Sequence, residues 1–92
     1  MASKTVPFNT RSAETLPNDK PVVYRIKTKG NKTNYVGIAQ RGRVQERIRE
    51  HLNNAQIPGA KVQIEQKSSI REARATEKRV IARSKPKYNK QG

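Results

Sequence analysis

The stretch 21-PVVYRIKTKGNKTNYVGIA-39 decides the fold, because it holds two β-rich runs on either side of a polar connection. In the first run Val22, Tyr24 and Ile26 fall on every second position, which is the period of a strand. The second run covers residues 35–39. Gly30-Asn31 in the connection is a turn signal. The stretch therefore predicts a β-hairpin with a polar loop.

A helix and a third strand are predicted to follow the hairpin. Val44, Ile48 and Leu52 recur at i, i+4 and i+8, as on one face of a helix, and the pattern stops at Asn53-Asn54. Beyond a Pro-Gly turn, the alternating run around residues 62–64 predicts a short strand.

The last regular element is predicted to be a helix over residues 69–84. Ser69 with Glu72 three positions later is a capping-box signature, and Pro86 stands just past the expected end. The elements then follow the order ββαβα. We expect an α+β fold in which a three-stranded, mostly antiparallel sheet is flanked by helices.

The first twenty residues are predicted to be a flexible N-terminal arm. Val6, Phe8 and Leu16 stand alone among polar residues and prolines, without the periodicity of a strand or a helix. The folded domain is expected to comprise residues 21–92, which is small and short of apolar residues.

The charge of the chain points to a polyanionic partner. Twenty-one basic residues face seven acidic ones, a net charge of +14, and nucleic acid is the leading candidate. An anionic membrane surface is disfavoured, because neither helix joins a broad apolar face to Trp or Phe anchors. With no cysteine, disulfides, thiolate zinc sites and cysteine nucleophiles are excluded. No apolar run suits a signal peptide or a membrane span, so the expected location is the cytoplasm.

Glu77 interrupts the apolar stripe of the final helix. Ile70, Ala73 and Ile81 fall at i, i+3 and i+11, and Glu77 occupies i+7. A carboxylate on a buried face costs several kcal/mol unless it is neutralised. Glu77 is therefore expected either to pair with a basic side chain or to hold a cation.

Five sequence features carry a resemblance to a known family. They are, in chain order, Val22-Val23-Tyr24, then Tyr35-Val36-Gly37, then Arg47 with His51 at i+4, then Glu77, and finally Pro86-Lys87-Tyr88-Asn89. In this order and on these elements they resemble the GIY-YIG nuclease superfamily. The resemblance covers nearly all of residues 21–92, which read as a small stand-alone nuclease domain.

The resemblance implies a metal ligand and a general base. It implies that Glu77 is the single carboxylate ligand of one divalent ion, Mg²⁺ or Mn²⁺; an ion pair is the alternative, although among its helical neighbours only Arg74 is basic. It implies that Tyr24 and Tyr35 activate and orient the attacking water. Tyr24 is the preferred base, with its pKa lowered by the metal and by Arg47. Alternatively, both tyrosines are packing residues of the sheet.

The remaining catalytic assignments concern Arg47, His51 and Asn89. A guanidinium suits the charge that develops on the non-bridging phosphate oxygens, which is the role implied for Arg47. His51, the chain's only histidine, is expected to assist proton movement or to bind a phosphate, unless it is an inert surface residue. Asn89 is expected to bind the scissile phosphate or to fix the C-terminal segment over the site, with a simple turn as the alternative.

Ile38 departs from the family pattern, because many members carry a lysine just after the glycine of the second motif. The substitution bears on catalytic efficiency. Six basic residues are expected to contact the nucleic-acid backbone: Arg43, Arg49, Arg74, Lys78, Lys85 and Lys87.

The sequence thus predicts a metal-dependent endonuclease that hydrolyses phosphodiester bonds in DNA or another nucleic acid. The alternatives are a non-catalytic basic module that binds nucleic acid, with RNA included among its ligands, and a ribosome-associated basic protein. A protein partner that supplies target specificity is compatible with either function.

Overall fold

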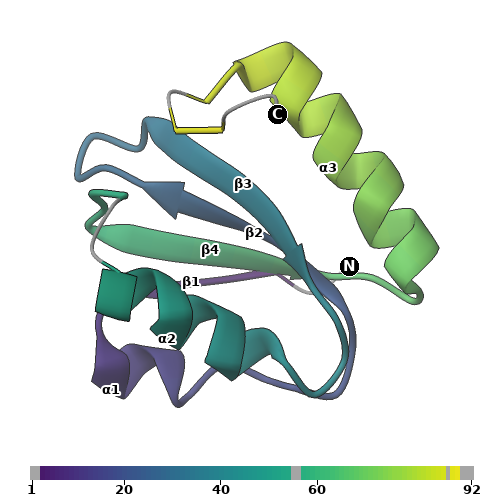
Figure 1. The fold of residues 1–92 in the computed structure, drawn as a ribbon, viewed down its shortest axis with the longest axis horizontal. Coiled ribbons are helices and arrows are strands. Elements are labelled where there is room, and N and C mark those ends of the chain that lie inside the picture. The colour runs from purple at the N-terminus through teal and green to yellow at the C-terminus, as the bar shows by residue number, and fades with distance from the viewer. Residues whose placement is uncertain (1–2, 55–56, 87, 90–92) are drawn as a thin grey trace.

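The computed structural model describes residues 3–54, 57–86 and 88–89. These residues form an antiparallel sheet of four strands and three helices (Figure 1). The strands are β1 (Ser3–Pro7), β2 (Val22–Lys27), β3 (Thr33–Ala39) and β4 (Lys61–Gln66), arranged in the order β1-β4-β2-β3. The helices are α1 (Thr10–Ala13), α2 (Val44–Asn54) and α3 (Ile70–Ser84).

The helices cover both faces of the sheet. Figure 1 shows α1 and α2 on one side and α3 on the other. Because side chains alternate along a strand, Tyr24 and Ile26 of β2 pack with Ile48 of α2, whereas Val23 packs with Ala73 of α3. Each face of the sheet is therefore buried against its own helical layer.

The predicted helices and the hairpin are confirmed. α2 buries Val44 and Ile48, and the Ser69 side chain caps α3 by accepting a hydrogen bond from the Glu72 backbone N–H at 3.2 Å. In the hairpin, Tyr24 lies opposite Gly37. The α+β class is also confirmed.

The expectation of three strands and a flexible N-terminal arm is wrong. Residues 3–7 form β1, which pairs with β4 along its whole length, and α1 follows. Ala13 and Leu16 are fully buried in the core beside α2, and Val6 joins them. A strand paired through its backbone needs few apolar side chains, so the composition of residues 1–20 concealed it.

The N-terminal segment also fixes the start of α2. The Asn18 side-chain oxygen accepts hydrogen bonds from the backbone N–H groups of Val44 at 2.8 Å and Gln45 at 3.3 Å. The Gln45 side chain donates in turn to the Leu16 carbonyl at 2.7 Å. Asn18 thus satisfies N–H groups that the first turn of a helix leaves without partners.

Replacement of Asn18 by alanine is predicted to destabilise the domain by about 0.5–2 kcal/mol, because the first turn of α2 loses its cap. Urea denaturation followed by circular dichroism measures the change. Lys20→Ala is the control, since Lys20 is exposed two residues away. Equal stability of the two variants would contradict the capping role.

Candidate active site

Two tyrosines and the histidine form a cluster between the hairpin and α2. The ring centroids of Tyr24 and Tyr35 lie 6.1 Å apart, and that of His51 lies 5.5 Å from Tyr24 and 4.9 Å from Tyr35. The Tyr24 hydroxyl and His51 Nε2 are 2.7 Å apart, a hydrogen-bond distance. The offset of the two tyrosines across β2 and β3 brings their rings to one place.

Gly37 makes this arrangement possible. A Cβ atom at position 37 would lie 2.5 Å from the Tyr24 hydroxyl oxygen and 3.0 Å from a ring carbon of Tyr35. The Tyr24 ring therefore lies directly on the backbone of its cross-strand partner. No side chain larger than hydrogen fits without moving the phenol, which explains the glycine of the Tyr-Val-Gly motif.

The surroundings fix the direction of the Tyr24–His51 hydrogen bond. Burial, reinforced by Tyr35, raises the pKa of Tyr24 more than the nearby Arg47 lowers it. Burial and the Arg47 charge lower the pKa of His51 below its usual 6.5. At neutral pH Tyr24 is therefore a protonated donor and His51 a neutral acceptor. The expectation that Arg47 lowers the Tyr24 pKa below its usual value is wrong for the protein without a metal ion. Burial of the phenol raises the pKa more than the Arg47 guanidinium lowers it.

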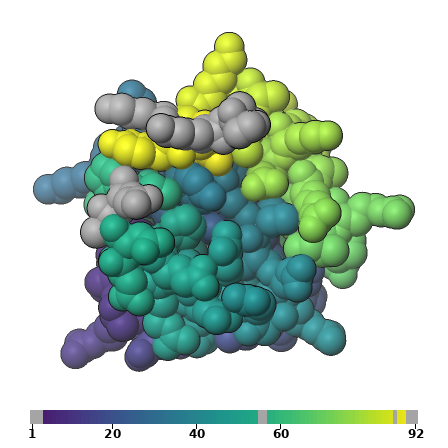
Figure 2. All heavy atoms as spheres, viewed as in Figure 1, coloured from purple at the N-terminus to yellow at the C-terminus, as the bar shows by residue number. Residues whose placement is uncertain are grey.

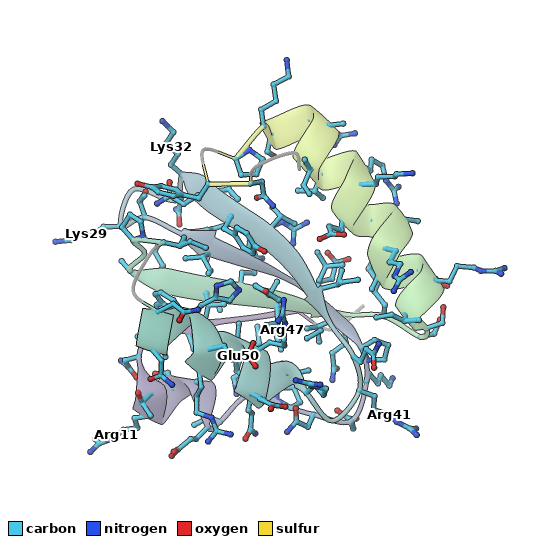
Figure 3. All side chains as sticks on the ribbon, viewed as in Figure 1. Arg11, Lys29, Lys32, Arg41, Arg47 and Glu50 are labelled. Carbon is cyan, nitrogen blue, oxygen red and sulfur yellow. The ribbon has the colours of Figure 1, made fainter. Side chains whose placement is uncertain are left out.

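Arg47 projects from α2 beside this cluster. Its guanidinium is 3.0 Å from the Glu50 carboxylate. The same carboxylate lies 3.9 Å from the Arg43 guanidinium, which also pairs with Glu46 at 3.0 Å. Figure 3 shows Arg47 and Glu50 close together at α2. Glu50 is not among the residues predicted from the sequence, although its i+3 spacing from Arg47 is a signal for such a pair.

Glu77 lines a pocket at the edge of the sheet. The pocket extends over Tyr35 of β3, over α3 and over the segment beyond it, and its other lining residues are Lys78, Ile81, Ala82, Lys85, Pro86 and Asn89. Ala73 and Thr76 are the buried residues of α3, so Glu77 sits at the border of the stripe rather than at its centre. Figure 2 shows β3 atoms at the surface between α2 and α3.

The chemistry of Glu77 fits a cation. Within residues 3–54, 57–86 and 88–89 its carboxylate makes no hydrogen bond or ion pair, and partial burial raises its pKa against the opposing effect of Arg74. In the same ranges no three Asp, Glu, His or Cys side chains gather as a metal-binding group. One half-buried carboxylate suits Mg²⁺, which retains waters and uses few protein ligands.

Asn89 fastens the C-terminal segment to the free edge of β3. Its side-chain oxygen accepts a hydrogen bond from the Val36 N–H at 2.7 Å, and its amide nitrogen donates to the Val36 carbonyl at 2.8 Å. The Tyr88 N–H donates to the Asn34 carbonyl at 2.8 Å. Of the two functions left open for Asn89, this geometry favours holding the segment beside the pocket.

The basic residues expected to contact a substrate divide into groups. Arg43 and Arg74 line a second pocket with Arg47 and Ile38, and Lys78 and Lys85 line the Glu77 pocket. Arg49 lines neither pocket and is exposed on α2. Lys87 lies outside the described residues.

The fold is similar to that of a solved GIY-YIG endonuclease domain. The chain is similar to the N-terminal GIY-YIG endonuclease domain of UvrC from Thermotoga maritima in its magnesium-bound form, with 28% identity and a TM-score of 0.69 over 88% of this chain and 96% of that one. Two variants of that domain match equally well, both bound to its catalytic divalent cation. A tyrosine-to-phenylalanine variant gives 27% identity and a TM-score of 0.69, and an asparagine-to-alanine variant 26% and 0.70; each match covers 89% of this chain and 96% of the other.

The resemblance predicted from the sequence is thus confirmed. No family model and no curated protein sequence matches the chain. Among the described residues, no helix has the length and apolar character needed to cross a membrane.

Gly37→Ala is predicted to displace the Tyr24 ring and to cost about 1–3 kcal/mol of stability, because the methyl group must push against a buried phenol. Thermal denaturation reports the cost, and the NMR signals of the His51 ring report the displacement. Gly30→Ala is the matched control, since the nearest atom to its added methyl is 3.9 Å away. Unchanged His51 signals in Gly37→Ala would contradict the close approach.

Proposed function

We propose that the chain is a metal-dependent endonuclease that hydrolyses phosphodiester bonds in DNA. The observation that carries this proposal is the hydrogen bond between the Tyr24 hydroxyl and His51 Nε2, which forms beside Arg47. Tyr35 contacts the His51 ring and also lines the pocket that contains Glu77. A base, a cation for the phosphate and a carboxylate for a metal ion are the parts that phosphodiester hydrolysis needs. The likeness to a Mg²⁺-binding UvrC endonuclease domain supports the same reaction.

Tyr24 and His51 act as a proton relay. Since the Tyr24 pKa is raised and the His51 pKa is lowered, Tyr24 is a poor base alone and His51 is a ready acceptor. The Tyr24 proton passes to His51 Nε2 as the phenol oxygen takes a proton from the attacking water. The water oxygen bonds to phosphorus, the bond to the leaving oxygen breaks, and that oxygen takes a proton from solvent.

Arg47 stabilises the negative charge on the phosphate. Its side chain is 40% exposed, so the guanidinium is open to an incoming anion. Binding a phosphate exchanges the Glu50 carboxylate for phosphate oxygens, to which a guanidinium can donate two parallel hydrogen bonds. An exposed ion pair of this kind contributes little energy, so the exchange costs little.

Glu77 is the proposed ligand of one Mg²⁺ or Mn²⁺ ion. A cation there offsets the burial that raises the carboxyl pKa. The ion supplies Lewis acidity at the phosphate and charge stabilisation for the leaving oxygen. Asn89 keeps the C-terminal segment in place beside Glu77, and Arg43, Arg74, Lys78 and Lys85 hold the flanking phosphates.

A non-catalytic module that binds nucleic acid is the second candidate. Ile38 favours it, because this residue packs against the α3 side of the sheet and brings no amine to the pocket that it shares with Arg47. Such a module binds nucleic acid with the same dependence on salt and leaves the substrate intact in Mg²⁺.

Glu77→Gln is predicted to lower Mg²⁺-dependent cleavage of plasmid DNA by about 10²–10⁴-fold, since the neutral amide is a weak ligand. Nicking is followed by agarose gel over a Mg²⁺ titration. Glu14→Gln is the control, because this substitution removes the same charge at an exposed position. Cleavage by Glu77→Gln at the rate of the control would refute the metal site.

The cleavage rate is predicted to rise with pH through the pKa of His51, which lies below 6.5, and to level off near neutrality. The sign follows because only the neutral imidazole accepts the Tyr24 proton. His51→Phe is predicted to cleave roughly 10²-fold more slowly and to lose the rise in rate that follows His51 deprotonation. The rise in rate that follows ionisation of the Glu77 carboxyl group remains in this variant. An unchanged rate and profile in His51→Phe would contradict the relay.

A further inference from the structure

A groove distinct from the two pockets described above lies on the other flank of α3, away from Glu77. It is lined by Arg25, Glu65 and Lys67 on the sheet side and by α3 and its end, with Thr76, Arg79, Val80, Arg83 and Ser84. At 100° per residue, Arg79 and Arg83 lie 160° and 120° around the helix from Glu77. The helix therefore separates this groove from the catalytic pocket.

The floor of this groove carries an excess of positive charge. One carboxylate, Glu65, is shared by Lys67 at 2.8 Å and Arg25 at 3.5 Å. The side chains are largely buried, with 10% of Lys67 and 17% each of Arg25 and Glu65 exposed. The two cations lower the Glu65 pKa, led by the Lys67 hydrogen bond, so the carboxylate is committed to the pairs.

Further cations extend the charged surface in two directions. Along the same face of the sheet, Lys27 lies directly opposite Lys61 in the β2–β4 register. Burial lowers the Lys27 pKa most, and the like charges of Arg25 and Lys61 lower it further. Above the floor, Arg79 and Arg83 form no ion pair with any described acidic residue. Juxtaposed like charges on a sheet are destabilising unless an anion bridges them.

We propose that this groove binds the phosphodiester backbone of a nucleic-acid segment other than the one at the catalytic pocket. The surface, here called the second basic groove, is defined by Arg25, Lys27, Lys61, Lys67, Arg79 and Arg83. Phosphates fit it because guanidinium and ammonium groups follow one another along it. An acidic protein is the weaker fit, because Val80 is the lone apolar side chain in the lining and protein interfaces rely on apolar or aromatic anchors.

This inference deepens the proposed function, since it gives the same substrate a second contact surface. The test is a binding measurement without divalent ions, so it does not depend on cleavage. A double variant, Arg79→Ala with Arg83→Ala, removes two exposed cations. The control, Arg11→Ala with Lys29→Ala, removes the same charge at sites that point into solvent from α1 and from the β2–β3 loop (Figure 3).

The affinity for a long DNA duplex is measured by fluorescence anisotropy over a range of salt concentrations. The Arg79/Arg83 variant is expected to bind roughly tenfold more weakly than the control, with a salt slope shallower by about 2, because about 0.9 is lost per phosphate contact. Cleavage at saturating DNA in Mg²⁺ is expected to match wild type. Equal affinity and slope in the two double variants would overturn the proposal, as would a loss of cleavage at saturation. If the wild-type protein does not cleave DNA but the Arg79/Arg83 variant binds it more weakly, the nuclease function is overturned and the proposal that the groove binds phosphates still holds.

Discussion

The contact between the Tyr24 phenol and the backbone of Gly37 is the constraint on which the site depends. It places a tyrosine hydroxyl, buried on the α2 side of the sheet, within 2.7 Å of His51 Nε2. Burial gives the pair its polarity, since desolvation keeps the proton on the phenol and off the imidazole. A glycine in the middle of a strand weakens the strand, and here it leaves the room that the Tyr24 ring occupies.

The rest of the fold brings the other groups to this contact. α2 carries Arg47 and His51 one helical turn apart, and the N-terminal segment fixes the start of α2 through Asn18. α3 packs on the opposite face, mainly against β3 and β2, and brings Glu77 to the free edge of the sheet. Asn89 then joins the C-terminal segment to that edge through both polar atoms of its amide. Residues from both helical layers thus lie on either side of one edge strand.

Much of this arrangement could be predicted from the sequence because it follows local periodicity. The hairpin, α2 and α3 each have a clear apolar pattern, and Glu77 is recognisable as a charge that interrupts the stripe of α3. Its place at the border of that stripe is visible only in the folded structure. β1 could not be predicted, since its stability comes from backbone pairing with β4, far along the chain. The pKa of Tyr24 was expected to move the wrong way, because burial is a tertiary property. Asn18 caps a helix that begins 26 residues later, and this partner is visible only in the folded structure. Glu50 stands at i+3 from Arg47, a spacing that is common on helix surfaces and does not by itself identify a pair.

A divalent ion is proposed to bind at Glu77, beside the tyrosine–histidine cluster. A Mg²⁺ titration followed by amide NMR tests this proposal most directly, because it needs neither substrate nor turnover. We expect saturable shifts centred on Glu77 and extending to Tyr35 and Asn89 across the pocket. Shifts confined to the exposed acids Glu14 and Asp19 would contradict it.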